Sequence, residues 1–236
     1  MPSNRLHYET HDSVAVLRMD DGKVNALSHD MIDALRAAFD RAESEAGAVL
    51  LVGRQGRLSG GFDLPTMAGG PESASKLVLA GAELLLHIYE YPRPVVVACS
   101  GHALAAGAIL LLVSDLCIGS TGSFKIGLNE VSIQLTLPVF GVELARARLS
   151  KRHFTKAVTQ AQIFDPEAAV DAGFLDRTTA PEALFDTALA EATRSANLPH
   201  PAFRDTKWRE RSATIRLIRE TLHDDIAAIT GVRPVP

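Results

Sequence analysis

Short apolar runs alternate along the chain with longer segments in which apolar residues recur every three or four positions. The runs at 48–54 and 94–100 are almost continuously apolar, which is typical of strands covered on both faces. Segment 29–44 has the helical spacing, and Ser28 before it predicts the N-cap of a helix. By the same criteria we expect strands at 12–21 and 115–120, and helices at 72–92, 105–113, 142–150, 154–162 and from Pro166 onward. This alternation predicts an α/β core.

The last part of the chain has a different pattern. Residues 197–201 contain two prolines, which cannot both lie inside a helix, so we expect a linker there. Residues 205–229 predict a long amphipathic helix, whose apolar face is formed by Ile215, Ile218, Leu222 and Ile226. We therefore divide the chain into a core at 1–196 and a C-terminal helical oligomerisation region at 197–236.

The overall composition is that of an ordinary globular protein. Apolar residues make up 47% of the chain and charged residues 22%, and no apolar run approaches the roughly 20 residues that a membrane span requires. The net charge of −4 leaves no surplus of positive charge to neutralise nucleic-acid phosphates. We therefore expect neither a membrane protein nor a nucleic-acid-binding protein.

The cysteines and histidines do not indicate a disulfide or a metal site. Cys99 and Cys117 both lie in apolar sequence, where a free thiol behaves as a small buried hydrophobe. The eight histidines include no pair at the spacing of metal ligands. The N-terminus has no apolar segment typical of a secretory signal, which together with the unpaired cysteines predicts a cytoplasmic protein without a bound metal.

Two glycine-rich loops, at 56–64 and 101–108, each follow a predicted strand directly. In the first loop, Gly60 and Gly61 free the backbone, so that the amide of Phe62 can point at a ligand. The second loop opens a helix, whose first amides lack acceptors within the helix and carry the positive end of its dipole. Each loop alone is common in α/β proteins. Two such amides aimed at one carbonyl oxygen form an oxyanion hole, which stabilises negative charge that develops during acyl chemistry.

Three segments in this order, LSGGFDL at 58–64, GHALAAGA at 101–108 and IGLNEV at 126–131, resemble the crotonase, or enoyl-CoA hydratase/isomerase, superfamily. The resemblance covers roughly residues 14–179 and includes the segments DGKVNALS and FDPEAAVDAGFLDR. It implies an α/β spiral of β-β-α units with a C-terminal helical region that mediates homotrimers, often paired into hexamers. It also implies an acyl-CoA substrate whose thioester enolate is stabilised, with no cofactor apart from the coenzyme A of the substrate.

The resemblance assigns the two oxyanion donors to the backbone amides of Phe62 and Ala106. The family usually has glycine at all three positions 105–107, whereas this chain has alanine at the first two. The backbone N–H of residue 106 can still donate a hydrogen bond after that change if residue 106 is already helical. By the same resemblance, the substrate and its coenzyme A contact Lys23, Val24, Ala26, Gly61, Asp63 and Ile109. Lys207 is a second candidate, besides Lys23, to meet a coenzyme A phosphate, unless these lysines are merely solvated.

The acidic residues distinguish this chain from the hydratases of the resembled family. Those hydratases generally use two glutamates, and the corresponding positions here are Ile109 and Glu130. The apolar neighbours Leu128 and Val131 favour a raised pKa for the carboxyl group of Glu130. With one acid, the chemistry that remains is the transfer of a proton from the α-carbon to the γ-carbon, which moves a double bond. The pattern resembles the mitochondrial-type enoyl-CoA isomerases of the superfamily.

Two alternatives to an isomerase remain open at this point. An enoyl-CoA hydratase of fatty-acid β-oxidation could take its second acid from elsewhere in the fold, or hold its water through backbone groups. Alternatively, the protein binds acyl-CoA without catalysing a reaction, and the first glutamate is absent because the site has lost its catalytic function. Acyl chain length, pathway and the choice between trimer and hexamer depend on pocket depth and helical surfaces, which the sequence pattern does not define.

Overall fold

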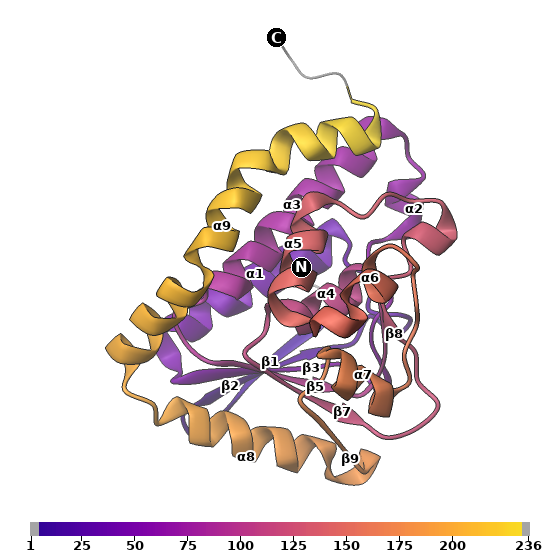
Figure 1. Cartoon of the computed structure of the whole chain (residues 1–236). Helices are drawn as coiled ribbons and strands as arrows, with labels where there is room; N and C mark the ends of the chain where they lie inside the picture. Colours follow the sequence, from indigo (N-terminus) through magenta and orange to yellow (C-terminus); the bar gives the residue numbers. More distant parts are fainter. Residues whose placement is uncertain (1–4, 233–236) are drawn as a thin grey trace.

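The computed structural model describes residues 5–232, which form a larger and a smaller β-sheet (Figure 1). In spatial order, the larger sheet contains β1 (Leu6–His11), β2 (Val14–Met19), β3 (Ala48–Val52), β5 (Val95–Cys99), β7 (Leu116–Ser120) and β9 (Arg177–Thr179). Its strands are parallel, except that β1 runs antiparallel to β2. The smaller sheet contains the parallel strands β4 (Gly56–Ser59), β6 (Gly101–Leu104) and β8 (Ile126–Gly127).

Helices cover both faces of the larger sheet, as Figure 1 shows. On one face lie α1 (His29–Glu45), α3 (Pro71–Glu90) and α4 (Ala106–Val113), and on the other lies α8 (Leu184–Ala196). Leu51 and Val97 belong to the hydrophobic core on the first side, and Leu50 and Val96 to the core beneath α8. All four side chains are fully buried. Because successive residues of a strand face opposite sides, two cores explain why β3 and β5 are continuously apolar.

The chain passes three times from the larger sheet to the smaller one, from β3 to β4, from β5 to β6 and from β7 to β8. The prediction for 101–108 was therefore incomplete, because β6 lies between β5 and the helix. Glycine at position 101 permits the crossing from β5 to β6, because any side chain would clash there: a Cβ would lie 2.0 Å from the backbone carbonyl carbon of Gly56. The hydroxyl of Ser100 donates to the carbonyl of Arg54 over 2.6 Å and so connects two of the crossings.

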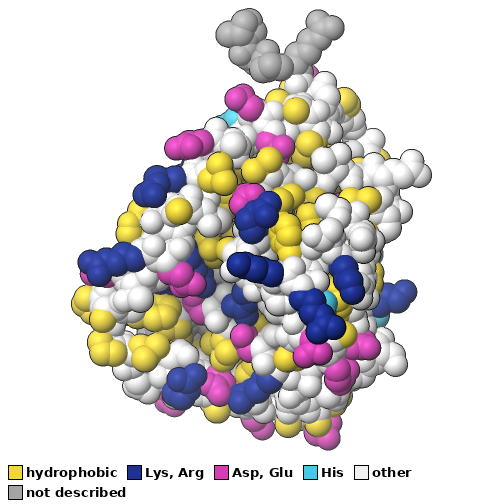
Figure 2. Space-filling view, in the orientation of Figure 1, with side chains coloured by type: hydrophobic (Ala, Val, Ile, Leu, Met, Phe, Trp, Pro, Cys, Tyr) yellow, Lys and Arg dark blue, Asp and Glu magenta, His cyan; other side chains and the backbone are white. Residues whose placement is uncertain are grey.

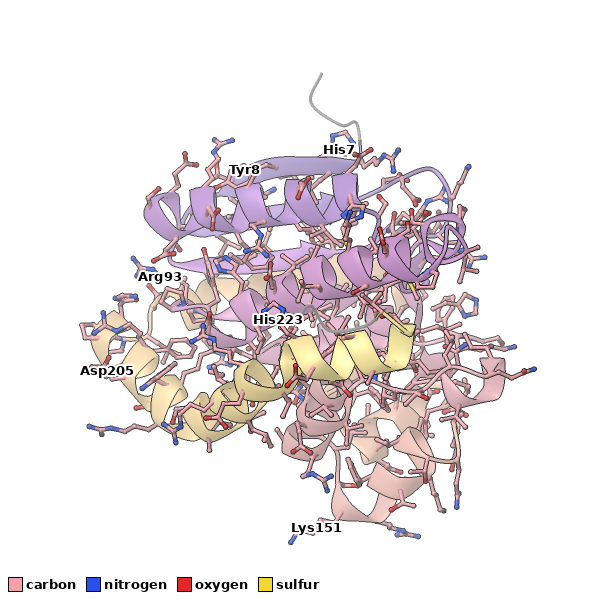
Figure 3. All side chains as sticks on the ribbon, turned by 90° about the horizontal axis from the view of Figure 1, so that it is seen from above. His7, Tyr8, Arg93, Lys151, Asp205 and His223 are labelled. Atoms are coloured by element: carbon pink, nitrogen blue, oxygen red, sulfur yellow. The ribbon has the colours of Figure 1, made fainter. Side chains whose placement is uncertain are left out.

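The C-terminal helix α9 (His200–Thr230) packs against the core along α3 (Figure 1). Its predicted apolar face is buried, at Ile215, Ile218, Leu222 and Ile226. Viewed from above, α9 carries Asp205 in its first turns and His223 nearer its end (Figure 3). The linker predicted at 197–201 extends too far, because α9 begins at His200. Pro201 is tolerated in the first turn, where a missing N–H costs no hydrogen bond.

The remaining helices are α2 (Leu64–Met67), α5 (Val139–Arg148), α6 (Lys151–Val158) and α7 (Pro166–Ala172). The predicted caps are confirmed, because the side chain of Ser28 accepts a hydrogen bond from the backbone of Met31, and that of Asp165 accepts one from Ala168. Helix α6 ends four residues before the predicted helix at 154–162 does. The same prediction also begins late, because α6 starts at Lys151.

Both cysteines are free and buried, as the sequence predicted. Burial raises the pKa of the Cys99 thiol to about 12, so this thiol stays protonated at neutral pH. Within residues 5–232, no helix combines the length and the apolar character needed to cross a membrane.

Candidate active site

A buried asparagine joins the loop after β2 to the end of β4. The side-chain amide of Asn25 donates to the carbonyls of Met19 and Leu58, over 3.0 and 3.1 Å. Its side-chain oxygen accepts a hydrogen bond from the backbone N–H of Asp21. Asn25 has a φ of 51°, a conformation that asparagine tolerates better than most residues. The two loops are therefore held together by a residue that the sequence did not single out.

The first expected oxyanion donor, the amide of Phe62, is directed away from the neighbouring loop. The N–H of Leu27 donates to the carbonyl of Gly61 over 2.8 Å, and the N–H of Asp63 donates to the carbonyl of Leu27 over 3.3 Å. These two hydrogen bonds form a parallel bridge around Phe62, in which the N–H of Phe62 itself takes no part. Among the hydrogen bonds of residues 5–232, this amide donates to no acceptor. It is therefore available to a ligand.

The second expected donor, the amide of Ala106, opens α4. The preceding residue, Ala105, has φ 51° and ψ −128°, so the chain turns sharply before the helix begins. The N–H of Ala105 donates to the carbonyl of Gly127, and its carbonyl accepts from Ile109 in the first helical turn. The N–H of Ala106 donates to no acceptor within the described part of the chain. Residue 106 is helical, so alanine there meets the condition for backbone donation.

Gly61 brings the two candidate amides together. A Cβ at this position would lie 3.4 Å from the backbone nitrogen of Ala106 and 3.1 Å from the carbonyl oxygen of Leu104. Gly61 itself has a φ of 93° and precedes Phe62 directly. The loop that carries the amide of Phe62 is thus in contact with the first turn of α4, and the absence of a side chain keeps the space between them open.

Glu130 lies after β8 at the start of a short 3-10 turn, Val131–Ile133. The residue is 8% exposed, and its Oε2 is buried without a hydrogen-bond partner among residues 5–232. Burial raises the pKa of this carboxyl to about 7, and a hydrogen bond from its own backbone N–H opposes that effect. The carboxyl can therefore take up or release a proton near neutral pH.

Glu130 opens into an apolar cavity of about 80 Å³. The walls include Phe62, Met67, Val78, Ile109, Phe140 and Ile229. In Figure 2, apolar side chains also gather on the surface over the upper ends of α3, α5 and α9. Thr136 and Thr230 are the other polar residues of the lining, and the Thr230 hydroxyl donates to the carbonyl of Ile226 within its own helix. Glu130 thus supplies the ionisable group of this cavity, and no carboxylate occupies the position of Ile109.

The residues expected to contact coenzyme A lie on the two linked loops. Lys23 and Val24 are exposed, and the carbonyl of Val24 accepts a hydrogen bond from the N–H of Gly60. The N–H of Ala26 donates to a carboxylate oxygen of Asp21 over 3.1 Å. The carboxylate of Asp63 caps α2, so only the backbone of this residue remains to border a ligand.

Lys207 is not a surface lysine, and the expectation that it could meet a phosphate is wrong. Its ammonium group lies 2.8 Å from the carboxylate of Asp115, and the side chain is 5% exposed. Burial lowers the pKa of Lys207 to about 8. Asp115 follows the C-terminal end of α4, about 12 Å from Ala106 along an eight-residue helix. Lys207 therefore anchors α9 at the end of α4 opposite the candidate amides.

Within residues 5–232, no three His, Cys, Asp or Glu side chains are placed to hold a metal ion. The candidate site of the described chain consists instead of two backbone amides, one carboxyl group and an apolar cavity.

Comparisons with known proteins show the family and the fold of this chain. The family described as Enoyl-CoA hydratase/isomerase matches residues 9–225. A crystal structure of an enoyl-CoA hydratase/isomerase family protein from Pseudomonas syringae is 41% identical, with a TM-score of 0.94 over 97% of this chain and 100% of that chain. This match confirms the expected α/β fold class.

Curated relatives carry the names of both reactions. Enoyl-CoA delta isomerase 1, mitochondrial, from Homo sapiens is 28% identical over 85% of this chain and 68% of the relative. A putative enoyl-CoA hydratase from Thermus thermophilus is 30% identical over 82% of this chain and 79% of the relative. The chain therefore belongs to the enoyl-CoA hydratase/isomerase family, as its crotonase-like motifs indicated.

Proposed function

We propose that the protein is an enoyl-CoA isomerase, which moves a double bond of an acyl-CoA thioester from the β,γ to the α,β position. The observation that carries this proposal concerns the apolar cavity beside Ile109: among the described residues that line it, only Glu130 has a carboxyl group. Proton transfer within one substrate needs one acid/base group. Addition of water would also need a group that holds and activates the water.

In the proposed mechanism, the thioester oxygen accepts hydrogen bonds from the amides of Phe62 and Ala106. The carboxylate of Glu130 removes a proton from the α-carbon, and the electrons of the C–H bond move toward the thioester oxygen as an enolate. The carboxylic acid then returns the proton to the γ-carbon, and the double bond forms between the α- and β-carbons. One donor of an oxyanion hole typically contributes about 3 to 4 kcal/mol of transition-state stabilisation.

The surroundings of Glu130 suit both halves of this reaction. A pKa of about 7 means that the carboxylate is a useful base and its conjugate acid a useful donor at neutral pH. Ile109 is 1% exposed and places hydrocarbon where a second acid would hold water. The same apolar walls strengthen the hydrogen bonds to the developing enolate, because the local dielectric is low.

We place the coenzyme A of the substrate on the linked loops that carry Lys23, Val24, Ala26, Gly61 and Asp63. The hydrogen bonds between these loops support this placement, because they hold a rigid backbone edge beside the two candidate amides. An exposed lysine, such as Lys23, suits the phosphates of coenzyme A.

The test is conversion of a 3-enoyl-CoA to the 2-enoyl isomer, followed by the absorbance of the conjugated thioester. For the wild-type protein, kcat/KM should rise with pH to a plateau above a midpoint of about 7, because the base must be ionised in the free enzyme. Glu130→Gln should lower kcat by about 10² to 10⁴. The same variant should still bind a saturated acyl-CoA. A variant that keeps the wild-type rate would exclude Glu130 as the base.

A hydratase is the second candidate, and the name of the Thermus thermophilus relative supports it. A hydratase would convert a 2-enoyl-CoA to a 3-hydroxyacyl-CoA faster than it isomerises a 3-enoyl-CoA. A protein that binds acyl-CoA without catalysis would do neither. The ratio of the two rates, measured on one preparation, therefore separates the three functions.

A further inference from the structure

The last turn of α9 forms one wall of the cavity into which Glu130 opens. Ile229 and Thr230 line this cavity, together with Val78 of α3 and Met67 of α2. One turn earlier, Ile226 is 2% exposed and belongs to the main hydrophobic core. The end of α9 is thus packed on the core, and Ile229 is held against the cavity.

A hydrogen bond connects this end of α9 to the segment that follows Glu130. The carboxylate of Asp225 accepts from the backbone N–H of Val139 over 2.7 Å. Val139 is the first residue of α5, and its N-cap residue, Pro138, provides no side-chain cap. A carboxylate at a helix N-terminus satisfies a free N–H and interacts favourably with the helix dipole. Asp225 therefore fixes the wall formed by Ile229 relative to Pro138 and Phe140, which also line the cavity.

The cavity beside Glu130 is small. Its volume is about 80 Å³. On a comparable measure, one water molecule needs about 10–15 Å³, and a cavity of about 150 Å³ holds the six carbons of benzene. By these two scales, the cavity accommodates about three to six carbon-sized groups. The Thr230 hydroxyl is bonded within its helix, so the wall offers the end of an acyl chain a hydrocarbon surface.

We propose that Ile229 is the residue that limits acyl chain length, and that the enzyme acts on short-chain enoyl-CoA thioesters of about four to six carbons. This inference rests on the proposed function, because it takes the cavity beside Glu130 to be the acyl site. Removing the Ile229 side chain beyond Cβ should lengthen the cavity toward the outside of α9 without changing the amides or the carboxyl group.

The experiment measures binding of saturated butanoyl-, hexanoyl- and decanoyl-CoA by calorimetry, and kcat/KM for the corresponding 3-enoyl-CoA thioesters. For the wild-type protein, we expect hexanoyl-CoA to be preferred over decanoyl-CoA by about tenfold or more, as one or two methylenes that do not fit can produce. Ile229→Ala should reduce this preference by about tenfold, and Ile229→Phe should shift the preference toward butanoyl-CoA. Leu217→Ala is the matched control, because Leu217 lies on the same helix, is 41% exposed and is absent from the cavity lining.

Thermal unfolding of each variant shows whether it is folded, and Ile229→Val provides a milder change if Ile229→Ala is unstable. The inference is overturned if the wild-type protein binds decanoyl-CoA as tightly as hexanoyl-CoA, or if folded Ile229 variants keep the wild-type preference. A chain-length limit in binding without turnover of any 3-enoyl-CoA would instead overturn the proposed isomerase and support the role of Ile229. Failure of the chain-length proposal can therefore be distinguished from failure of the proposed isomerase function.

Discussion

Replacing the carboxyl group of Glu130, the proposed acid/base, should make the protein more stable at high pH. Burial raises the pKa of Glu130 from 4.5 to about 7, which means that the folded protein favours the protonated form. Below about pH 4.5 the carboxyl is protonated in both the folded and the unfolded chain, and above about pH 7 the folded protein bears the full cost of the buried charge. At about 1.36 kcal/mol per pKa unit, this cost is about 3 kcal/mol.

Urea unfolding of the wild-type protein and Glu130→Gln, at about pH 4.5 and about pH 8, measures this cost directly. The free energy of unfolding of the wild-type protein should fall by about 3 kcal/mol relative to that of the variant between the two pH values. All other titrating groups are common to both proteins, so their contributions cancel in the comparison. If the free energies of unfolding of the wild-type protein and Glu130→Gln differ by the same amount at both pH values, the carboxyl group of Glu130 is not desolvated. The proposed proton shuttle would then lack its physical basis.

Three further predictions concern the surroundings of the site. Ala105→Gly should raise the free energy of unfolding by about 1 kcal/mol, because φ 51° with ψ −128° strains alanine. Ala108→Gly, within the helix, should instead lower the free energy of unfolding by a similar amount. If Ala105→Gly lowers the free energy of unfolding, Ala105 is not strained. Ile109→Glu should catalyse measurable hydration of a 2-enoyl-CoA, whereas Ile109→Gln should not. Equal rates of hydration by the two variants would show that a second carboxyl group at this position is not what hydration requires. Asp225→Ala should cost about 1 kcal/mol and weaken acyl-CoA binding, because it removes the cap of α5. Asp224→Ala, at an exposed neighbour, should change neither quantity.

The main elements of the fold could be predicted because their signals are local. The apolar runs of β3 and β5, the Ser28 cap and the apolar face of α9 each need only a few neighbouring residues. The strands of the smaller sheet were missed, because they are two to four residues long and have no clear alternation. Their pairing depends on residues far apart in the chain, such as Gly56 and Gly101.

The location of the candidate site was predicted in part, whereas the residues that support it were missed. Glu130 and Ile109 lie in one cavity, as the motif comparison suggested. The role of Asn25, which holds Leu58 across the loops, was missed, and so was Asp225, which caps α5 from the C-terminal helix. Lys207 was misjudged, because its partner Asp115 is 92 residues away and no local pattern indicates their pairing. Assembly into trimers or hexamers remains a prediction from the family resemblance.

The proposed isomerase moves a proton within an acyl-CoA and does not add water. The most direct measurement incubates the purified protein with 3-hexenoyl-CoA and, separately, with 2-hexenoyl-CoA, and follows both products by chromatography and mass spectrometry. We predict rapid formation of 2-hexenoyl-CoA from the first substrate and little gain of water by the second. Rapid formation of 3-hydroxyhexanoyl-CoA from 2-hexenoyl-CoA, without isomerisation of 3-hexenoyl-CoA, would contradict the proposed isomerase function.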